Sequence, residues 1–297
     1  MKTMRIIQTM FVFSLLFCVS CSSANENLSD ERRETSDESV DSILEKLNKS
    51  TQELQSYQCQ IEYKYVQPSV WDTQTLRKGV LYYSKSDNSE SNGSGKGMSK
   101  LRVNFQTLQQ DEDEEQKYEE QYIIVDGSSL PGTNDKYKGL WLIQLDYESK
   151  HCNYAQLARA DEPNKPVDVF ELISTKLPIV GFSKTDRLKE EFEIALVTRD
   201  SESPGGGGLI QVQLKVKPNS VYKDDYVQID CVIDEKLNLP VKITAYSTEP
   251  EGETFKNKDK YEIKFINAKM NEKIDGKVFD FQISEDFGEP DIYTLEN

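Results

Sequence analysis

The side chains that could act as nucleophile, base or metal ligand are few in this sequence. Its 297 residues contain one histidine, His151, followed directly by Cys152. A cysteine and a histidine can form a nucleophile–base pair. Neighbouring residues of a strand point to opposite faces, so these two side chains should not meet. A single histidine also excludes a histidine-rich zinc site. We therefore expect no catalytic residues and no metal site.

Acidic residues are numerous, and one dense run of them could suggest a calcium site. Gln109–Glu120 reads QQDEDEEQKYEE and lacks the alternating acids and central glycine of an EF-hand loop. We interpret it as the solvated loop at a hairpin tip. No pair of carboxylates is marked for acid–base catalysis, and no GxSxG motif occurs. A hydrolase therefore ranks third, after the lipid-binding and protein-binding hypotheses given below.

The charge balance limits the partners. Lys and Arg number 36 and Asp and Glu 52, which gives a net charge of −16. Such a charge repels nucleic-acid phosphates and disfavours electrostatic attachment to an anionic membrane surface. No strand–glycine-rich loop–helix unit for a nucleotide is present. We expect no nucleic acid partner and no cofactor, and we expect a monomer.

The first residues, MKTMRIIQTMFVFSLLFCVSCSSA, form an export signal. Lys2 and Arg5 precede an apolar stretch from Met10 to Val19. This stretch is shorter than the about 20 residues that span a bilayer, and small residues follow it. The pattern is typical of a secretory signal peptide, so the protein is predicted to be exported to the periplasm.

The cleavage site has two readings. Val19-Ser20-Cys21 resembles the end of a bacterial lipobox, although Cys18 stands where leucine is usual. In this reading residues 1–21 are signal and lipobox, and Cys21 is acylated and anchors the protein to a membrane. Polar residues 22–36 would be a disordered tether to a single domain at 37–297. The alternative is ordinary cleavage after Ala24, and the sequence leaves both open.

Three cysteines remain beyond the leader: Cys59, Cys152 and Cys231. An odd number cannot pair completely within one chain, so one disulfide is the most that can form. The sequence does not decide whether any does.

The pattern of apolar residues predicts a helix, many strands, two helices and many strands again. The first helix, 37–56, has apolar residues at three- and four-residue spacing. Alternation with a period of two then predicts strands separated by turn signals. The expected strands are 58–66, 78–84, 100–105, 121–126, 140–146, 192–198, 209–216, 226–234, 241–246 and 261–268, with helices at 167–177 and 185–192 and a short aromatic segment at 278–283. This order is an α+β arrangement, with helices covering an antiparallel sheet. Either a filled core or an apolar cavity would fit.

Several segments together resemble the outer-membrane lipoprotein carrier family, the LolA and LolB proteins. They are Leu54-Gln55-Ser56-Tyr57, Lys78-Gly79-Val80-Leu81-Tyr82-Tyr83, Lys100-Leu101-Arg102-Val103, Val125-Asp126-Gly127 with Leu140-Trp141-Leu142-Ile143, Leu239-Pro240-Val241-Lys242, Tyr261-Glu262-Ile263-Lys264-Phe265-Ile266-Asn267 and Val278-Phe279-Asp280-Phe281-Gln282-Ile283. The resemblance extends over most of the chain from Val40 to Ile283. It consists of turns and strand patterns, without catalytic residues.

The resemblance implies a curved, open antiparallel half-barrel under a helical lid. In that family an apolar cavity receives acyl chains of lipoproteins, and transfer needs no covalent chemistry. The corresponding binding residues would be six from the wall and two from the lid: Leu101, Val103, Phe105, Ile124, Trp141 and Ile143, with Phe170 and Ile173.

Two features depart from a diffusing carrier. The loops at 86–98 and 109–120 are long insertions, and an anchor at Cys21 would hold the protein at a membrane. A tethered acceptor or ligand sensor then fits better than a shuttle, whereas cleavage after Ala24 would restore the shuttle. The alternative from another class is an envelope scaffold or sensor that binds a protein through the concave face of its sheet.

Overall fold

The structure, a computed structural model, describes residues 39–68, 72–85, 99–127, 130, 139–159, 185–200, 208–250, 252–280 and 282–295. The predicted leader with Cys21, the tether at 22–36 and the loop at 86–98 lie outside these residues. So do the predicted helix at 167–177 and its two lid residues, Phe170 and Ile173.

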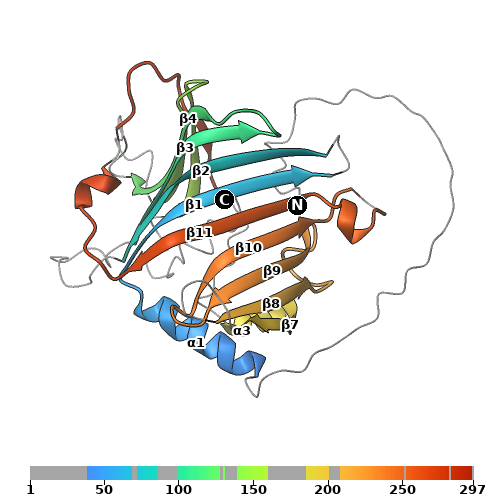
Figure 1. The fold of residues 1–297 in the computed structure, drawn as a ribbon. Helices are drawn as coiled ribbons and strands as arrows, with labels where there is room; N and C mark the ends of the chain where they lie inside the picture. The colour runs from blue at the N-terminus through green and yellow to red at the C-terminus, as the bar shows by residue number, and fades with distance from the viewer. Residues whose placement is uncertain are drawn as a thin grey trace, which may run out of the picture. The chain divides into compact units, whose positions relative to one another are not determined.

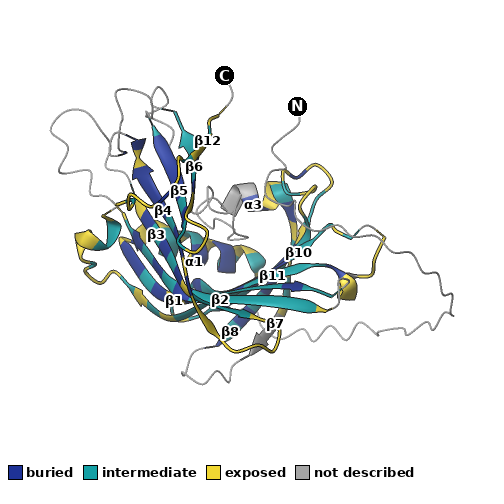
Figure 2. Cartoon of the chain, turned by 90° about the horizontal axis from the view of Figure 1, so that it is seen from above, coloured by how far each residue is buried: buried dark blue, intermediate teal, exposed yellow. Residues whose placement is uncertain are grey.

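Twelve strands of the described chain form one sheet in the order β12-β6-β5-β4-β3-β2-β1-β11-β10-β9-β8-β7. Figure 1 shows the part from β4 to β7, and Figure 2 labels β5, β6 and β12. The strands are β1 (Ser56–Gln67), β2 (Thr73–Ser84), β3 (Lys100–Gln110), β4 (Gln116–Asp126), β5 (Leu140–Asp146), β6 (His151–Ala158), β7 (Phe192–Asp200), β8 (Leu209–Val216), β9 (Tyr226–Asp234), β10 (Leu239–Ser247), β11 (Lys260–Met270) and β12 (Asp291–Tyr293). The end strands β12 and β7 do not pair with each other, so the sheet is open.

Two antiparallel meanders are joined at the centre of this sheet. β1 to β6 follow one another in space as in sequence, and so do β7 to β11. β1 then pairs antiparallel with β11, with Ile61 opposite Phe265. The short β12 is the exception, since it pairs parallel with β6. An open, largely antiparallel sheet is the predicted half-barrel class, which is thereby confirmed.

The predicted first helix is present as α1 (Val40–Glu53). The Ser39 hydroxyl accepts a hydrogen bond from the Ser42 amide at 3.2 Å and caps its first turn. Ile43, Leu44 and Leu47 are buried on one side of the helix, as their spacing requires. A second helix, α3 (Thr185–Glu191), directly precedes β7.

Two points of the sequence analysis need correction. β6 was not predicted. The aromatic segment at 278–283, for which the sequence predicted no secondary structure, begins as a 3-10 helix (Gly276–Phe279). The acidic run 109–120 is mostly strand: its ends belong to β3 and β4, and only 111–115 form the tip. Charged residues are compatible with a strand when alternate side chains face solvent, so the charge density concealed the two-residue period.

The sheet has apolar residues on both faces over part of its width. We call the face that packs with α1 the inner face and the opposite one the outer face. The inner cluster unites α1 residues with residues of β1 to β5 and of β7 to β11. A separate outer cluster lies on β4 to β6 and contains Ile123, Val125, Leu130, Trp141, Ile143, Leu145, Cys152, Tyr154 and Phe287. Figure 2 shows buried residues along both of these regions.

The described residues after β11, which we call the C-terminal segment, cover part of the outer face. Phe287 packs edge-on against Tyr147 with ring centroids 5.1 Å apart. Arg102 donates hydrogen bonds to the carbonyls of Val278 and Asp280 at 2.8 and 3.0 Å. These contacts bind the segment to β3 and to the turn after β5. Within the described residues, no helix is long and apolar enough to cross a membrane.

Candidate functional site

Four of the predicted wall residues lie together on the inner face. Leu101, Val103 and Phe105 alternate along β3, and Ile124 lies on β4 directly opposite Leu101. The three β3 residues are completely buried and Ile124 is nearly so. The two-residue period of the sequence therefore located one continuous apolar surface, which is the first part of the candidate site.

Trp141 and Ile143 lie on the other side of the sheet. Ile124 is paired with Leu142, so Leu140 and Leu142 are the β5 residues on the inner face. Trp141 and Ile143 belong to the outer cluster with Phe287. Because β5 is apolar on both faces, its alternation carries no information about which face is which. The six predicted wall residues thus do not share one surface.

The two described helices are too small to cover the inner face alone. Strands lie about 4.8 Å apart, so the twelve-stranded sheet measures on the order of 50 Å along its strand order. α1 has 14 residues and is about 21 Å long, and the 7-residue α3 is about 10 Å long. These two helices are therefore shorter than the sheet is wide.

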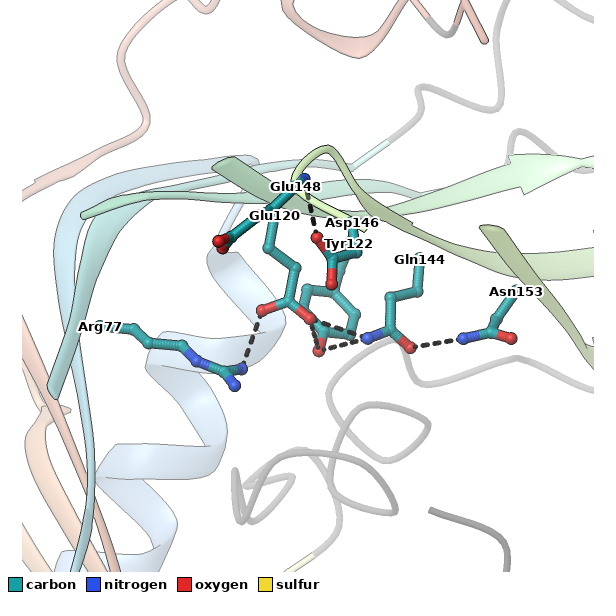
Figure 3. Close-up of polar contacts among 7 residues, drawn as sticks. All are labelled: Arg77, Glu120, Tyr122, Gln144, Asp146, Glu148 and Asn153. Carbon is teal, nitrogen blue, oxygen red and sulfur yellow. Dashed lines mark hydrogen bonds and ion pairs between the residues drawn. The ribbon is translucent and has the colours of Figure 1, made fainter. Parts of the chain in front are cut away.

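A polar network forms the second part of the site, on the same inner face (Figure 3). Its centre is Glu120 of β4, which lies directly opposite Phe105 and is almost fully buried. Arg77 of β2 donates from Nη1 to Glu120 Oε2 at 2.8 Å. The guanidinium also lies over the Tyr118 ring, 5.6 Å from its centroid. This ion pair is therefore held next to the apolar surface.

Neutral groups extend the network towards β6. The Tyr122 hydroxyl donates to Glu120 Oε1 at 2.8 Å, and Gln144 Nε2 donates to the same oxygen at 2.8 Å. Asn153 Nδ2 in turn donates to Gln144 Oε1 at 3.3 Å. Both oxygens of Glu120 are thus engaged by donors, which is how a carboxylate is kept in a buried position.

Burial and the ion pair act on the pKa values of this network. Burial alone would lower the pKa of Arg77, but Glu120 and the neighbouring tyrosines raise it above its ordinary value. Burial and then Glu120 raise the pKa of Tyr122 well above that of free tyrosine. Tyr122 is therefore a neutral hydrogen-bond donor at physiological pH, and Arg77 is fully charged.

A row of tyrosines on β1, β11 and β9 lies on the side of Arg77 away from Glu120. Tyr63 lies directly opposite Arg77 on β1. Tyr65 and Tyr261 are stacked with centroids 4.7 Å apart, and Tyr65 donates to Asp259 at 2.8 Å. Tyr226 meets the Tyr261 ring edge-on at 6.2 Å. One end of the strands is thus apolar, whereas the other carries hydroxyls, an amide and an ion pair.

The sequence analysis did not identify Arg77 or Glu120. Glu120 was assigned to a solvated loop because it closes the acidic run. The usable signal was the alternation of Tyr118, Glu120, Tyr122 and Ile124, which places a carboxylate in an otherwise apolar row of β4. A charged residue in such a row requires a buried partner.

The one histidine and its neighbouring cysteine do not form a nucleophile–base pair in the structure. His151 is half exposed and contacts Asn153 and Asp291, at 3.0 and 3.3 Å. Cys152 is buried in the outer cluster, so the adjacent pair is separated by the sheet as expected. Among the described residues, no group of three or more His, Cys, Asp or Glu side chains could hold a metal ion.

The three cysteines of the folded part are all free and buried. Cys59 and Cys231 belong to the inner cluster and Cys152 to the outer one. Burial raises the pKa of Cys59 to about 12 and that of Cys152 to about 11, and it also raises the pKa of Cys231. Each thiol is thus protonated at neutral pH.

We expect these thiols to be unreactive in the folded protein. Iodoacetamide reacts with the thiolate, which needs a pH above the raised pKa and access that burial denies. Peptide mapping after labelling at neutral pH should find Cys59, Cys152 and Cys231 unmodified, and the same protein in denaturant should be labelled at all three. Rapid labelling of the native protein would contradict the described packing.

Comparisons with known proteins concern the fold. The chain matches a LolA superfamily protein from Nitrosomonas europaea at 13% identity, over 81% of this chain and 97% of that one, with a TM-score of 0.27. It matches the Mycobacterium tuberculosis lipoprotein LppX at 10% identity, over 80% of this chain and 99% of that one, with a TM-score of 0.37. It matches a chain of the Pseudomonas aeruginosa MucA/MucB complex at 11% identity, over 81% of this chain and 60% of that one, with a TM-score of 0.39. This chain therefore spans less than two thirds of that protein.

These TM-scores are low, and the fold class therefore rests on the strand order and the open edges described above. No protein-family model matches the chain. No curated protein matches it either. What the fold and the site define is an open, largely antiparallel half-barrel whose inner face is apolar at one end and polar at the other.

Proposed function

We propose that the protein is a non-enzymatic protein of the cell envelope that binds acyl chains of lipids or lipoproteins against the inner face of its sheet. The observation that carries this proposal is the continuous apolar surface of Leu101, Val103, Phe105, Ile124 and Leu142, on three neighbouring strands. These five side chains are buried in the inner cluster together with residues of α1, so an acyl chain would bind by displacing groups that pack on them.

The energetics of such binding need no covalent step. Each buried CH₂ group contributes about 0.8 kcal/mol, so a long acyl chain supplies several kcal/mol. Release then requires only a conformation with a smaller contact surface. Phe170 and Ile173 remain the proposed lid residues, because they are apolar and belong to a segment predicted to be an amphipathic helix.

Its place in the cell follows from the leader. We infer an exported, periplasmic protein anchored through an acylated Cys21, with 22–36 as tether and 37–297 as the binding domain. An anchored protein would act as acceptor or sensor, whereas cleavage after Ala24 would free it to act as a carrier. Mass spectrometry of the mature N-terminus distinguishes these, since an unmodified Asn25 start excludes the lipoprotein.

The binding proposal predicts a bound lipid in protein purified from its own host. Native mass spectrometry should show an adduct with the mass of an acyl-containing molecule. The delipidated protein should enhance phenylnaphthylamine fluorescence, and added fatty acyl ester should reverse the enhancement. Absence of both signals would reject the proposal and favour a scaffold that binds a protein.

A further inference from the structure

We propose that the network around Arg77 and Glu120 binds the polar end of the acyl ligand and selects an uncharged ester or amide over a carboxylate. This inference rests on the proposed function, since it assumes that an acyl chain occupies the inner face. It adds the chemical class of the ligand's head and the residues that recognise it.

The first argument is position. Glu120 pairs directly with Phe105, and Tyr122 pairs directly with Val103, so polar and apolar groups are neighbours across β3 and β4. The rows of Ile124 and Tyr122 are two residues apart along β4, which corresponds to about 7 Å. A chain lying on the apolar surface would therefore bring its head to Arg77 and Tyr122.

The second argument is an available donor. Arg77 uses Nη1 for Glu120, and its Nε–H is buried without a hydrogen-bond partner among the described residues. The Arg77 side chain as a whole is 30% exposed, so a ligand can approach the guanidinium, but its carbonyl would reach the buried Nε–H only after the groups that cover this atom move. An unsatisfied buried donor is unfavourable, and a carbonyl oxygen of the ligand would satisfy it.

The third argument is charge. Glu120 already compensates the guanidinium, and its own side chain is only 3% exposed. A carboxylate ligand would add a second negative charge beside Glu120. The free-energy cost of desolvating that carboxylate would not be offset, because the described residues of the site offer no uncompensated cation. An ester or amide carbonyl accepts the same hydrogen bond without that charge. The Arg77–Glu120 ion pair thus makes the site selective for uncharged hydrogen-bond acceptors such as ester and amide carbonyls.

The test compares dodecanoate with its methyl ester at neutral pH, each displacing phenylnaphthylamine from the delipidated full chain. The wild type should bind the ester about tenfold more tightly, because dodecanoate would place a second, desolvated negative charge beside Glu120. Equal affinities, or a preference for dodecanoate, would overturn the inference and leave the proposed function intact. Binding of neither ligand would overturn both.

Glu120→Gln should reverse this preference. The amide keeps the size of the side chain and can rotate to accept from Arg77 or Tyr122, so folding should persist. Arg77 would then be uncompensated, and dodecanoate should bind about tenfold more tightly than the ester. Glu119→Gln is the matched control, because Glu119 is exposed and lies on the other face of β4. It should retain the wild-type preference.

Arg77→Gln distinguishes recognition from a purely structural role. It removes the cation that compensates Glu120, so the preference for the ester should rise above that of the wild type, while the apolar surface still binds both chains. A merely structural role would weaken both ligands in proportion and leave their ratio unchanged, which would contradict the inference. If Glu120→Gln does not fold, the ratios of the wild type and Arg77→Gln still decide the question.

Discussion

Replacing Gly79 with alanine should destabilise the protein by about 3 kcal/mol or more, enough to remove much of the stability of a typical domain. Gly79 lies on β2 between Ile61 of β1 and Phe105 of β3. A Cβ atom at this position would lie 1.9 Å from the carbonyl oxygen of Asn104 and 2.8 Å from the Phe105 Cα. Both are backbone atoms of the neighbouring strand, so no side-chain rotation relieves the contact.

The close approach has a local cause. The register of β2 with β3 shifts between Lys78 and Gly79, where β3 carries an extra residue. A bulge of this kind bends the strand and brings one backbone onto the other, and glycine is the residue that allows it. The glycine therefore fixes the position of Phe105 on the inner face.

Chemical denaturation measures the effect of this substitution. Gly288→Ala is the matched control, because a Cβ there meets no heavy atom within 4 Å. The Gly288 variant should unfold close to the wild-type midpoint, whereas Gly79→Ala should unfold at a much lower denaturant concentration or fail to accumulate. Equal midpoints for the two variants would show that β2 and β3 are not as close as described.

The strands were predictable where apolar and polar residues alternate between clear turns. β5, β8 and β9 have the bounds predicted from sequence. The sheet order was less accessible, because the pairing of β1 with β11 joins residues about two hundred positions apart. No local signal specifies such a pairing, because the two strands are far apart in the sequence.

The candidate site was predictable in part, and two cases show why. Leu101, Val103 and Phe105 alternate with polar residues, so their shared face followed from the two-residue period. In β5, Trp141 and Leu142 are both buried, on opposite faces, because the C-terminal segment covers the outer face. That cover comes from residues far along the chain. A strand that is apolar on both sides cannot indicate it.

Phe105→Ala and Trp141→Ala should separate stability from binding. Both side chains are almost completely buried, and removing a buried aromatic ring costs about 3–5 kcal/mol. Both variants should therefore unfold at lower denaturant concentration, by a similar amount. Their effects on a ligand should differ, because Phe105 belongs to the inner cluster and Trp141 to the outer one.

The affinity for dodecanoate methyl ester shows which face binds the ligand. It is measured at denaturant concentrations well below both midpoints. Phe105→Ala should weaken it about tenfold, since the ring contributes apolar contact beside Arg77 and Glu120. Trp141→Ala should leave it within about twofold of the wild type, because the sheet separates Trp141 from the inner face. The opposite pattern would assign the ligand to the outer face, under the C-terminal segment. Because the two variants lose similar stability, a difference in affinity between them cannot be attributed to partial unfolding.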